Sequence, residues 1–102
     1  MSLYVNKVWC VYMLRQDNGN LYTGITSNLT RRITQHSNKR GAKCLRAAKN
    51  LKLVYRSASV YDYKTAARME YILKRKRSKH FKLRVIKNKP LLLDKYMLAN
   101  KL

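Results

Sequence analysis

Hydrophobic residues near the start of the chain form two short runs separated by a turn sequence. Val8–Leu14 and Leu21–Ile25 have the length of strands, and Asp17-Asn18-Gly19 lies between them, which predicts a β-hairpin. A three-residue loop would place Tyr12 and Tyr22 on the same face of the sheet. A two-residue loop would place them on opposite faces, because strand side chains alternate. The sequence leaves both registers open.

The spacing of apolar residues becomes helical after this hairpin. From residue 27 or 28, where a serine or asparagine can cap a helix, to residue 36 or 37, apolar and histidine side chains recur at i, i+4 and i+7. One side of this helix therefore faces the core. Arg32 and His36 border that side, whereas Arg31 points towards solvent. Geometry thus favours Arg32 as the arginine held beside the core.

The second half of the chain continues with one strand and further helices. Alternating Leu51, Leu53 and Tyr55 predict a third strand over Leu51–Val60. The elements expected after it are a helix over Thr65–Arg77, a short helix over Lys79–Ile86 capped by Ser78, and an apolar tail over Leu91–Leu102. The order predicts an α/β (α+β) fold with a small, mostly antiparallel sheet flanked by helices. We expect one domain over residues 1–86 and a tail over residues 87–102 that packs on it or contacts a partner.

Charge adds the strongest functional signal. Lys and Arg number 24 against 4 Asp and Glu, which gives a formal net charge of +20. Such an excess favours a polyanionic partner, because neutralising phosphates releases counterions whatever the base sequence. A membrane is disfavoured, since Lys or Arg interrupts every long apolar run before the roughly 18 residues that a span requires.

The two cysteines and the N-terminal segment indicate the compartment. Cys10 and Cys44 form no CxxC pair and, even with His36 and His80, lack the spacing of a zinc site. We expect free thiols in a reducing compartment. The first apolar run lacks a small-residue cleavage site and predicts a strand rather than a signal peptide. These features favour the cytoplasm.

The scarcity of acidic residues limits metal chemistry. Only Asp17, Asp62, Glu70 and Asp94 are present. Two-metal nucleases hold ions roughly 4 Å apart with several convergent carboxylates, so such a site is disfavoured. A single Mg²⁺ needs only one or two carboxylates, and Glu70, inside a basic helix, is the natural ligand. The alternative is a helical i, i+4 ion pair between Glu70 and Lys74.

Several residues of this chain together form a family pattern. The pattern consists of Val11-Tyr12-Met13, Tyr22-Thr23-Gly24, Arg32 ten residues after Tyr22, His36 four residues later, and Glu70 in a downstream helix. It resembles the GIY-YIG nuclease superfamily over residues 7–84, and is most similar to the small stand-alone single-domain members, which also carry a segment like Gly41-Ala42-Lys43. The first triplet differs in both outer residues and the second has threonine for isoleucine, whereas both tyrosines and the glycine match.

The resemblance implies a metal-dependent endonuclease that hydrolyses phosphodiester bonds of DNA, with a role in repair or processing. Tyr22 would help activate the attacking water, with Tyr12 and His36 in its hydrogen-bond network. Arg32 would clamp the scissile phosphate. Glu70 would hold a single Mg²⁺ or Mn²⁺ ion. These residues are the catalytic set that the resemblance assigns.

The resemblance also assigns a structural role and raises a question of specificity. Gly24 would let the backbone approach a neighbour where a side chain would not fit. Many members carry a further polar residue, often asparagine, after the glutamate, and Asn88 is the nearby candidate. Specificity in such single domains often comes from elsewhere, so we expect a protein partner to supply it.

Two basic runs are predicted to contact nucleic acid through phosphates rather than bases. The residues expected to do so are Lys39, Arg40, Lys43, Arg46, Lys74 and Arg77. Two other functions stay open at this point. One is a non-catalytic module that binds DNA or structured RNA, which would show salt-sensitive affinity without nicking. The other is a small basic ribosome-associated protein, which would sediment with ribosomes.

Overall fold

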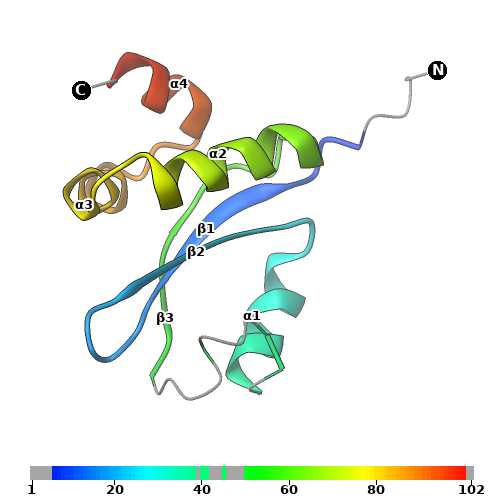
Figure 1. Cartoon of the computed structure of the whole chain (residues 1–102). Coiled ribbons are helices and arrows are strands. Elements are labelled where there is room, and N and C mark those ends of the chain that lie inside the picture. The colour runs from blue at the N-terminus through cyan, green and yellow to red at the C-terminus, as the bar shows by residue number, and fades with distance from the viewer. Residues whose placement is uncertain (1–5, 39, 42–44, 46–49, 101–102) are drawn as a thin grey trace.

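A three-stranded antiparallel sheet lies between two layers of helices in the computed structural model, which describes residues 6–38, 40–41, 45 and 50–100 (Figure 1). The elements are β1 (Cys10–Arg15), β2 (Leu21–Thr26), α1 (Leu29–Ser37), β3 (Lys52–Arg56), α2 (Tyr63–Arg75), α3 (Lys79–Asn88) and α4 (Leu93–Ala99). The sheet order is β2-β1-β3, so β1 is central and β2 is an edge strand. The predicted α/β class with a small antiparallel sheet is confirmed.

The turn between β1 and β2 decides the register that the sequence left open. Gln16 N–H donates to Asn20 O at 2.9 Å, and Gly19 has a φ of +87°, in the left-handed region that glycine tolerates best. The loop therefore has three residues. Tyr12 pairs with Gly24, and Tyr22, which precedes Gly24 by two residues in β2, points to the same face of the sheet. Tyr12 and Tyr22 are diagonal neighbours on one face of the sheet.

The two faces of β1 pack against different layers. Val11 and Met13 face the main hydrophobic core beneath α2, α3 and α4, while Tyr12 and Leu14 belong to a smaller cluster on the side of α1. Figure 1 shows α1 on one side of the sheet and the other three helices on the opposite side. A single strand thus supplies both the main core and the residues beside α1, because its side chains alternate.

Side-chain caps fix where the helices begin. Asn28 Oδ1 accepts from Arg31 N–H at 3.0 Å and Asp62 Oδ1 from Thr65 N–H at 2.7 Å. The second helix starts at Tyr63, not at Thr65, because Asp62 is its cap. Ser78 caps α3 as expected, although that helix runs to Asn88.

The third strand is shorter than predicted, and its alternation is interrupted. It ends at Arg56 because the Ser57 hydroxyl, rather than a strand carbonyl, accepts from Val11 N–H at 3.0 Å. The pairing with β1 also shifts, so that Leu53 lies opposite Leu14 and the next pair is Tyr55 with Met13. This irregularity places Leu53 and Tyr55 on opposite faces, and Leu53 is exposed.

Helix α4, within the expected apolar tail, packs on the domain. Leu93 and Met97 are buried in the main core. The Tyr61 hydroxyl donates to Asp94 Oδ1 at 2.6 Å. Burial, together with this carboxylate, raises the pKa of Tyr61 to about 12, so the hydroxyl keeps its proton and remains the donor.

Candidate active site

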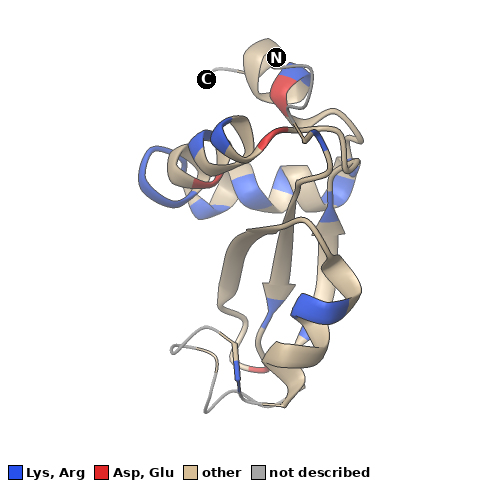
Figure 2. Cartoon of the chain, turned by 90° about the vertical axis from the view of Figure 1, so that its right-hand side faces the viewer, with Lys and Arg blue, Asp and Glu red and all other residues tan. Residues whose placement is uncertain are grey.

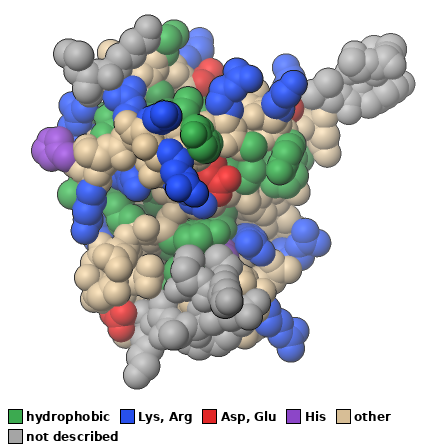
Figure 3. All heavy atoms as spheres, viewed as in Figure 1, with side chains coloured by type: hydrophobic (Ala, Val, Ile, Leu, Met, Phe, Trp, Pro, Cys, Tyr) green, Lys and Arg blue, Asp and Glu red, His purple; other side chains and the backbone are tan. Residues whose placement is uncertain are grey.

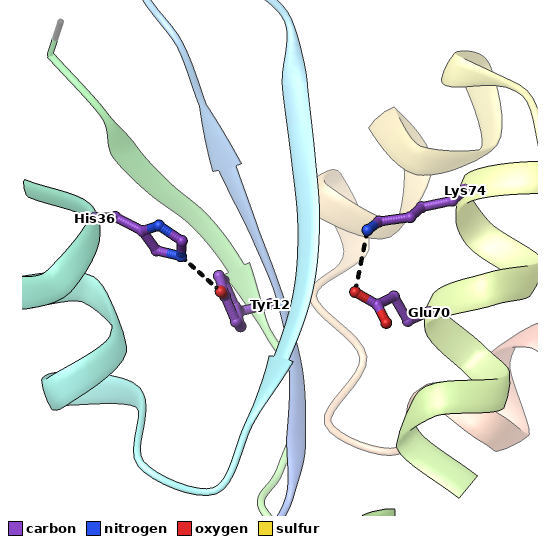
Figure 4. Close-up of polar contacts among 4 residues, drawn as sticks. All are labelled: Tyr12, His36, Glu70 and Lys74. Atoms are coloured by element: carbon purple, nitrogen blue, oxygen red, sulfur yellow. Dashed lines mark hydrogen bonds and ion pairs between the residues drawn. The ribbon is translucent and has the colours of Figure 1, made fainter. Parts of the chain in front are cut away.

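A tyrosine and a histidine, both buried, form the centre of the candidate site. Tyr12 in β1 is 0% exposed, and His36 in the last turn of α1 is 1% exposed. The Tyr12 hydroxyl oxygen and His36 Nε2 are 2.9 Å apart (Figure 4). Burial and the nearby Arg32 lower the pKa of His36, so the imidazole is neutral at pH 7. Burial and the neighbouring Tyr22 raise the pKa of Tyr12, which stays protonated.

Tyr22 and Arg32 pack beside this pair and remain partly exposed. The Tyr22 ring is edge-on to the His36 ring, with centroids 5.4 Å apart. Partial burial alone would lower the pKa of Arg32, but interactions with the hydroxyls of Tyr12 and Tyr22 raise it. Arg32 Nη1 also donates to Gln35 Oε1 at 3.0 Å. A guanidinium has several donors in a planar fork, so it can hold these groups and still bind a phosphate.

Glycines leave the space that the buried pair fills. A Cβ on Gly24 would lie 2.6 Å from the Tyr12 hydroxyl oxygen and 2.7 Å from its Cζ. A Cβ on Gly41 would overlap His36 at Nδ1. The contact of Gly41 with His36 was not anticipated from the sequence. An isolated glycine in a basic stretch signals a close approach but does not say which residue it meets.

Glu70 enters the site from the opposite side of the sheet. It projects from α2 towards β2, whereas His36 reaches Tyr12 from α1 (Figure 4). Glu70 Oε2 is 3.2 Å from Lys74 Nζ, and that ammonium lies 5.3 Å from the centroid of the Tyr22 ring. The Glu70 charge also contributes to the raised pKa of Tyr12. The site is therefore assembled at the edge strand β2, from α1 on one side and α2 on the other.

The residues fit a single hard cation rather than a metal cluster. No group of three or more His, Cys, Asp or Glu that could hold a metal occurs among the described residues. The other three acids lie elsewhere, in the hairpin turn (Asp17), at the cap of α2 (Asp62) and on α4 (Asp94). Glu70 already binds a cation, the Lys74 ammonium. One carboxylate is enough for Mg²⁺ or Mn²⁺ when water and a substrate phosphate complete the coordination.

The basic residues expected to contact nucleic acid fall into different settings. Lys39, Lys43 and Arg46 lie outside the described residues. Arg40 is exposed, and Lys74 is paired with Glu70. Lys and Arg recur along α2 and α3 (Figure 2), and they predominate over acidic side chains on the face shown in Figure 3.

Arg77 and Asn88 are engaged within the protein. The Arg77 guanidinium lies 4.2 Å from the centroid of the Phe81 ring, and its Nη2 is 3.5 Å from Met97 O. These contacts connect the segment that follows α2 with α3 and α4. Asn88 Nδ2 donates to the Tyr96 hydroxyl at 2.9 Å, so its side chain is directed to α4.

The fold and this arrangement of residues define the class of protein. Residues 8–84 match the family model of the GIY-YIG catalytic domain, which covers most of the chain. The chain therefore belongs to the GIY-YIG family. GIY-YIG proteins form a superfamily of nucleases that generally depend on a divalent metal ion. The chain therefore has a nuclease-type domain, and the implied substrate is nucleic acid.

Relatives occur in viruses and bacteria. The chain is 79% identical over 101 residues to a UPF0213 protein from the VLF1-GP41 intergenic region of Autographa californica nuclear polyhedrosis virus, covering 99% of this chain and 97% of the relative. It is 46% identical over 79 residues to a GIY-YIG domain-containing protein of invertebrate iridescent virus 6, covering 78% and 79%. The solution structure of the UPF0213 protein BH0048 from Bacillus halodurans matches with a TM-score of 0.51 and 33% identity, covering 79% of this chain and 84% of that one. In the described part of the chain, no helix has the length and apolar character needed to cross a membrane.

Proposed function

We propose that this protein is a metal-dependent endonuclease that hydrolyses phosphodiester bonds of DNA and acts in DNA repair or processing. The observation that carries the proposal is the meeting of Tyr22, Arg32 and Glu70 at β2, next to the buried pair of Tyr12 and His36. A group that orients the attacking water, a phosphate clamp and a metal ligand are groups that phosphodiester hydrolysis uses.

In this proposal the three partly exposed residues act on the phosphate, the attacking water and the metal ion, one residue on each. Arg32 binds the scissile phosphate and stabilises the charge that develops on it. The Tyr22 hydroxyl hydrogen-bonds to the attacking water and orients it. Glu70 would hold the ion, which would supply positive charge to the phosphate and the leaving oxygen.

Tyr12 and His36 act as positioning residues in the same proposal. Their burial prevents direct contact with nucleic acid, but their hydrogen bond fixes the ring against which Tyr22 packs. The interaction with the Tyr12 hydroxyl also raises the pKa of Arg32. Loss of this support should reduce turnover by misplacing Tyr22 and Arg32 rather than by removing a reacting group.

The test is nicking of supercoiled plasmid with and without Mg²⁺, using neighbouring residues as matched controls. Arg32→Ala should lower the rate by about 10²-fold or more, the range for loss of a charge-stabilising donor. Arg31→Ala, one residue away and exposed, should leave it nearly unchanged. Tyr22→Phe and Glu70→Gln should also abolish most nicking, while Tyr71→Phe, at an exposed position next to Glu70, should not.

Equal rates for Arg31→Ala and Arg32→Ala, or nicking that persists in Glu70→Gln, would refute the proposed site. The same assay on RNA tests the choice of DNA. A protein partner that supplies specificity belongs to this proposal, and affinity capture that recovers nucleic acid without protein would argue against it.

The second candidate is a basic nucleic-acid-binding module without turnover. The Glu70–Lys74 ion pair favours it, because the carboxylate of the candidate site already has a partner. This candidate predicts that affinity falls steeply with salt and that no Mg²⁺-dependent nicks appear in any variant.

A further inference from the structure

The carboxylate of Glu70 is already bound by a cation that belongs to the chain itself. Lys74 follows Glu70 by one helical turn, and its Nζ lies 3.2 Å from Oε2. The lysine side chain is 39% exposed and that of Glu70 is 24% exposed, so the pair sits at the surface of the site. The same ammonium lies 5.3 Å from the Tyr22 ring centroid. Lys74 therefore occupies the space between the metal-ligand candidate and the tyrosine that faces the substrate.

An ammonium and a divalent ion cannot share this carboxylate without strong repulsion. Unit charges about 4 Å apart repel appreciably even in water, and a divalent ion doubles the effect. The other three acids belong to the hairpin turn (Asp17), the cap of α2 (Asp62) and α4 (Asp94), and no group of three or more metal-binding side chains occurs among the described residues. Lys74 therefore opposes the binding of a metal ion at Glu70 for as long as the ion pair is formed.

We propose that Lys74 is a tethered competitor for the metal ion at Glu70, and that it must leave this carboxylate when the ion binds. This inference rests on the proposed metal-dependent function and concerns the regulation of the same site. A flexible, partly exposed lysine can swing away from the helix without disturbing the core. Once released beside Tyr22, its ammonium is available to a substrate phosphate, which couples metal binding to nucleic-acid binding.

Arg75 provides a matched control for the general effect of charge. It is the next residue of the same helix and is also exposed. Lys74→Met removes the ammonium but keeps most of the apolar stem, and Arg75→Met removes one positive charge from the neighbouring position. Both variants lower the net charge of the protein by one. A difference in their Mn²⁺ affinity therefore reports the effect of the Lys74 ammonium beside Glu70.

The experiment measures Mn²⁺ affinity of the full chain by electron paramagnetic resonance at low salt, without nucleic acid. Lys74→Met should tighten binding on the order of tenfold over wild type, because both competition and repulsion at Glu70 are lost. Arg75→Met should change it by about twofold or less, since that charge is screened by solvent. In a Glu70→Gln background, Lys74→Met should have no such effect.

Three results would overturn the inference. Affinities of Lys74→Met and Arg75→Met that agree within about twofold would show that Lys74 does not compete. Tightening that survives Glu70→Gln would locate the ion elsewhere, and absence of saturable Mn²⁺ binding in every variant would remove the site. Plasmid nicking by wild type separates the two proposals. If wild type nicks plasmid but Lys74→Met and Arg75→Met bind Mn²⁺ with equal affinity, only the inference about Lys74 is contradicted. If Lys74→Met binds Mn²⁺ more tightly but wild type does not nick plasmid, only the proposed endonuclease is contradicted.

Discussion

Gly24→Ala should destabilise the fold through one contact with the buried tyrosine. The new Cβ would lie 2.6 Å from the Tyr12 hydroxyl oxygen and 2.7 Å from Cζ, closer than real Cβ atoms approach other groups. Tyr12 is 0% exposed in the central strand and is held by His36 at 2.9 Å, so the ring has no free space to move into. Either the strands separate or the ring shifts and breaks its hydrogen bond.

The size of the effect follows from these two consequences. Overpacking a core costs about 1–3 kcal/mol, and leaving buried hydrogen-bonding groups without partners costs about 1–3 kcal/mol. The two are partly alternative, so we expect the free energy of unfolding to fall by about 2–4 kcal/mol. For a domain of this size that lowers Tm by roughly 10–20 °C.

Urea unfolding followed by circular dichroism measures this change. Gly19→Ala is the control, because no atom lies within 4 Å of the new Cβ and only the positive φ of +87° is strained. It should cost about 1 kcal/mol. Tyr12→Phe should cost about 1–2 kcal/mol alone but under about 0.5 kcal/mol in the Gly24→Ala background, because it also removes the hydroxyl oxygen that the new Cβ meets at 2.6 Å. A stability of Gly24→Ala within about 0.5 kcal/mol of wild type would refute the reasoning.

Two further predictions concern pH and the C-terminal helix. Burial and Arg32 lower the pKa of His36 in the folded state below its usual 6.5. The unfolded chain therefore takes up a proton at this histidine before the folded chain does. The stability that the neutral His36 contributes is present above pH 6.5 and is lost as the pH falls towards the lower folded-state pKa. Urea titrations across this range should show a weaker loss of stability in His36→Gln than in wild type, and equal slopes for the two proteins would contradict the prediction. Asp94→Ala removes the 2.6 Å acceptor of the Tyr61 hydroxyl and should cost about 1.5–3 kcal/mol by the same measurement, whereas no change would mean that this bond does not hold α4.

Features encoded by neighbouring residues were predictable from the sequence. The starts of α1 and α3 followed from the asparagine and serine caps, because a cap acts within a few residues of itself. The preference for Arg32 over Arg31 followed from helical spacing alone, and Arg31 is exposed while Arg32 is partly buried. The predicted start of α2 at Thr65 lies two residues too late, because Asp62 was not included as the cap of this helix.

Features that depend on distant contacts were not predictable. The third strand ends where Ser57 bonds to Val11, a partner 46 residues away in sequence. The irregularity that turns Leu53 and Tyr55 to opposite faces exists only in the pairing with β1. An alternating pattern indicates a strand, but it cannot show where the partner strand shifts register.

The same distinction between local sequence and distant contacts applies to the candidate site. The sequence by itself determined the residue types and their order, and through the resemblance of these motifs it also indicated the family. Tertiary structure decided the rest. It placed Tyr12 and Tyr22 on one face through a three-residue turn, buried Tyr12 with His36, and brought Glu70 to β2 already paired with Lys74. These outcomes depend on which side of a sheet each helix packs and on how closely backbones approach, and only the folded chain fixes both.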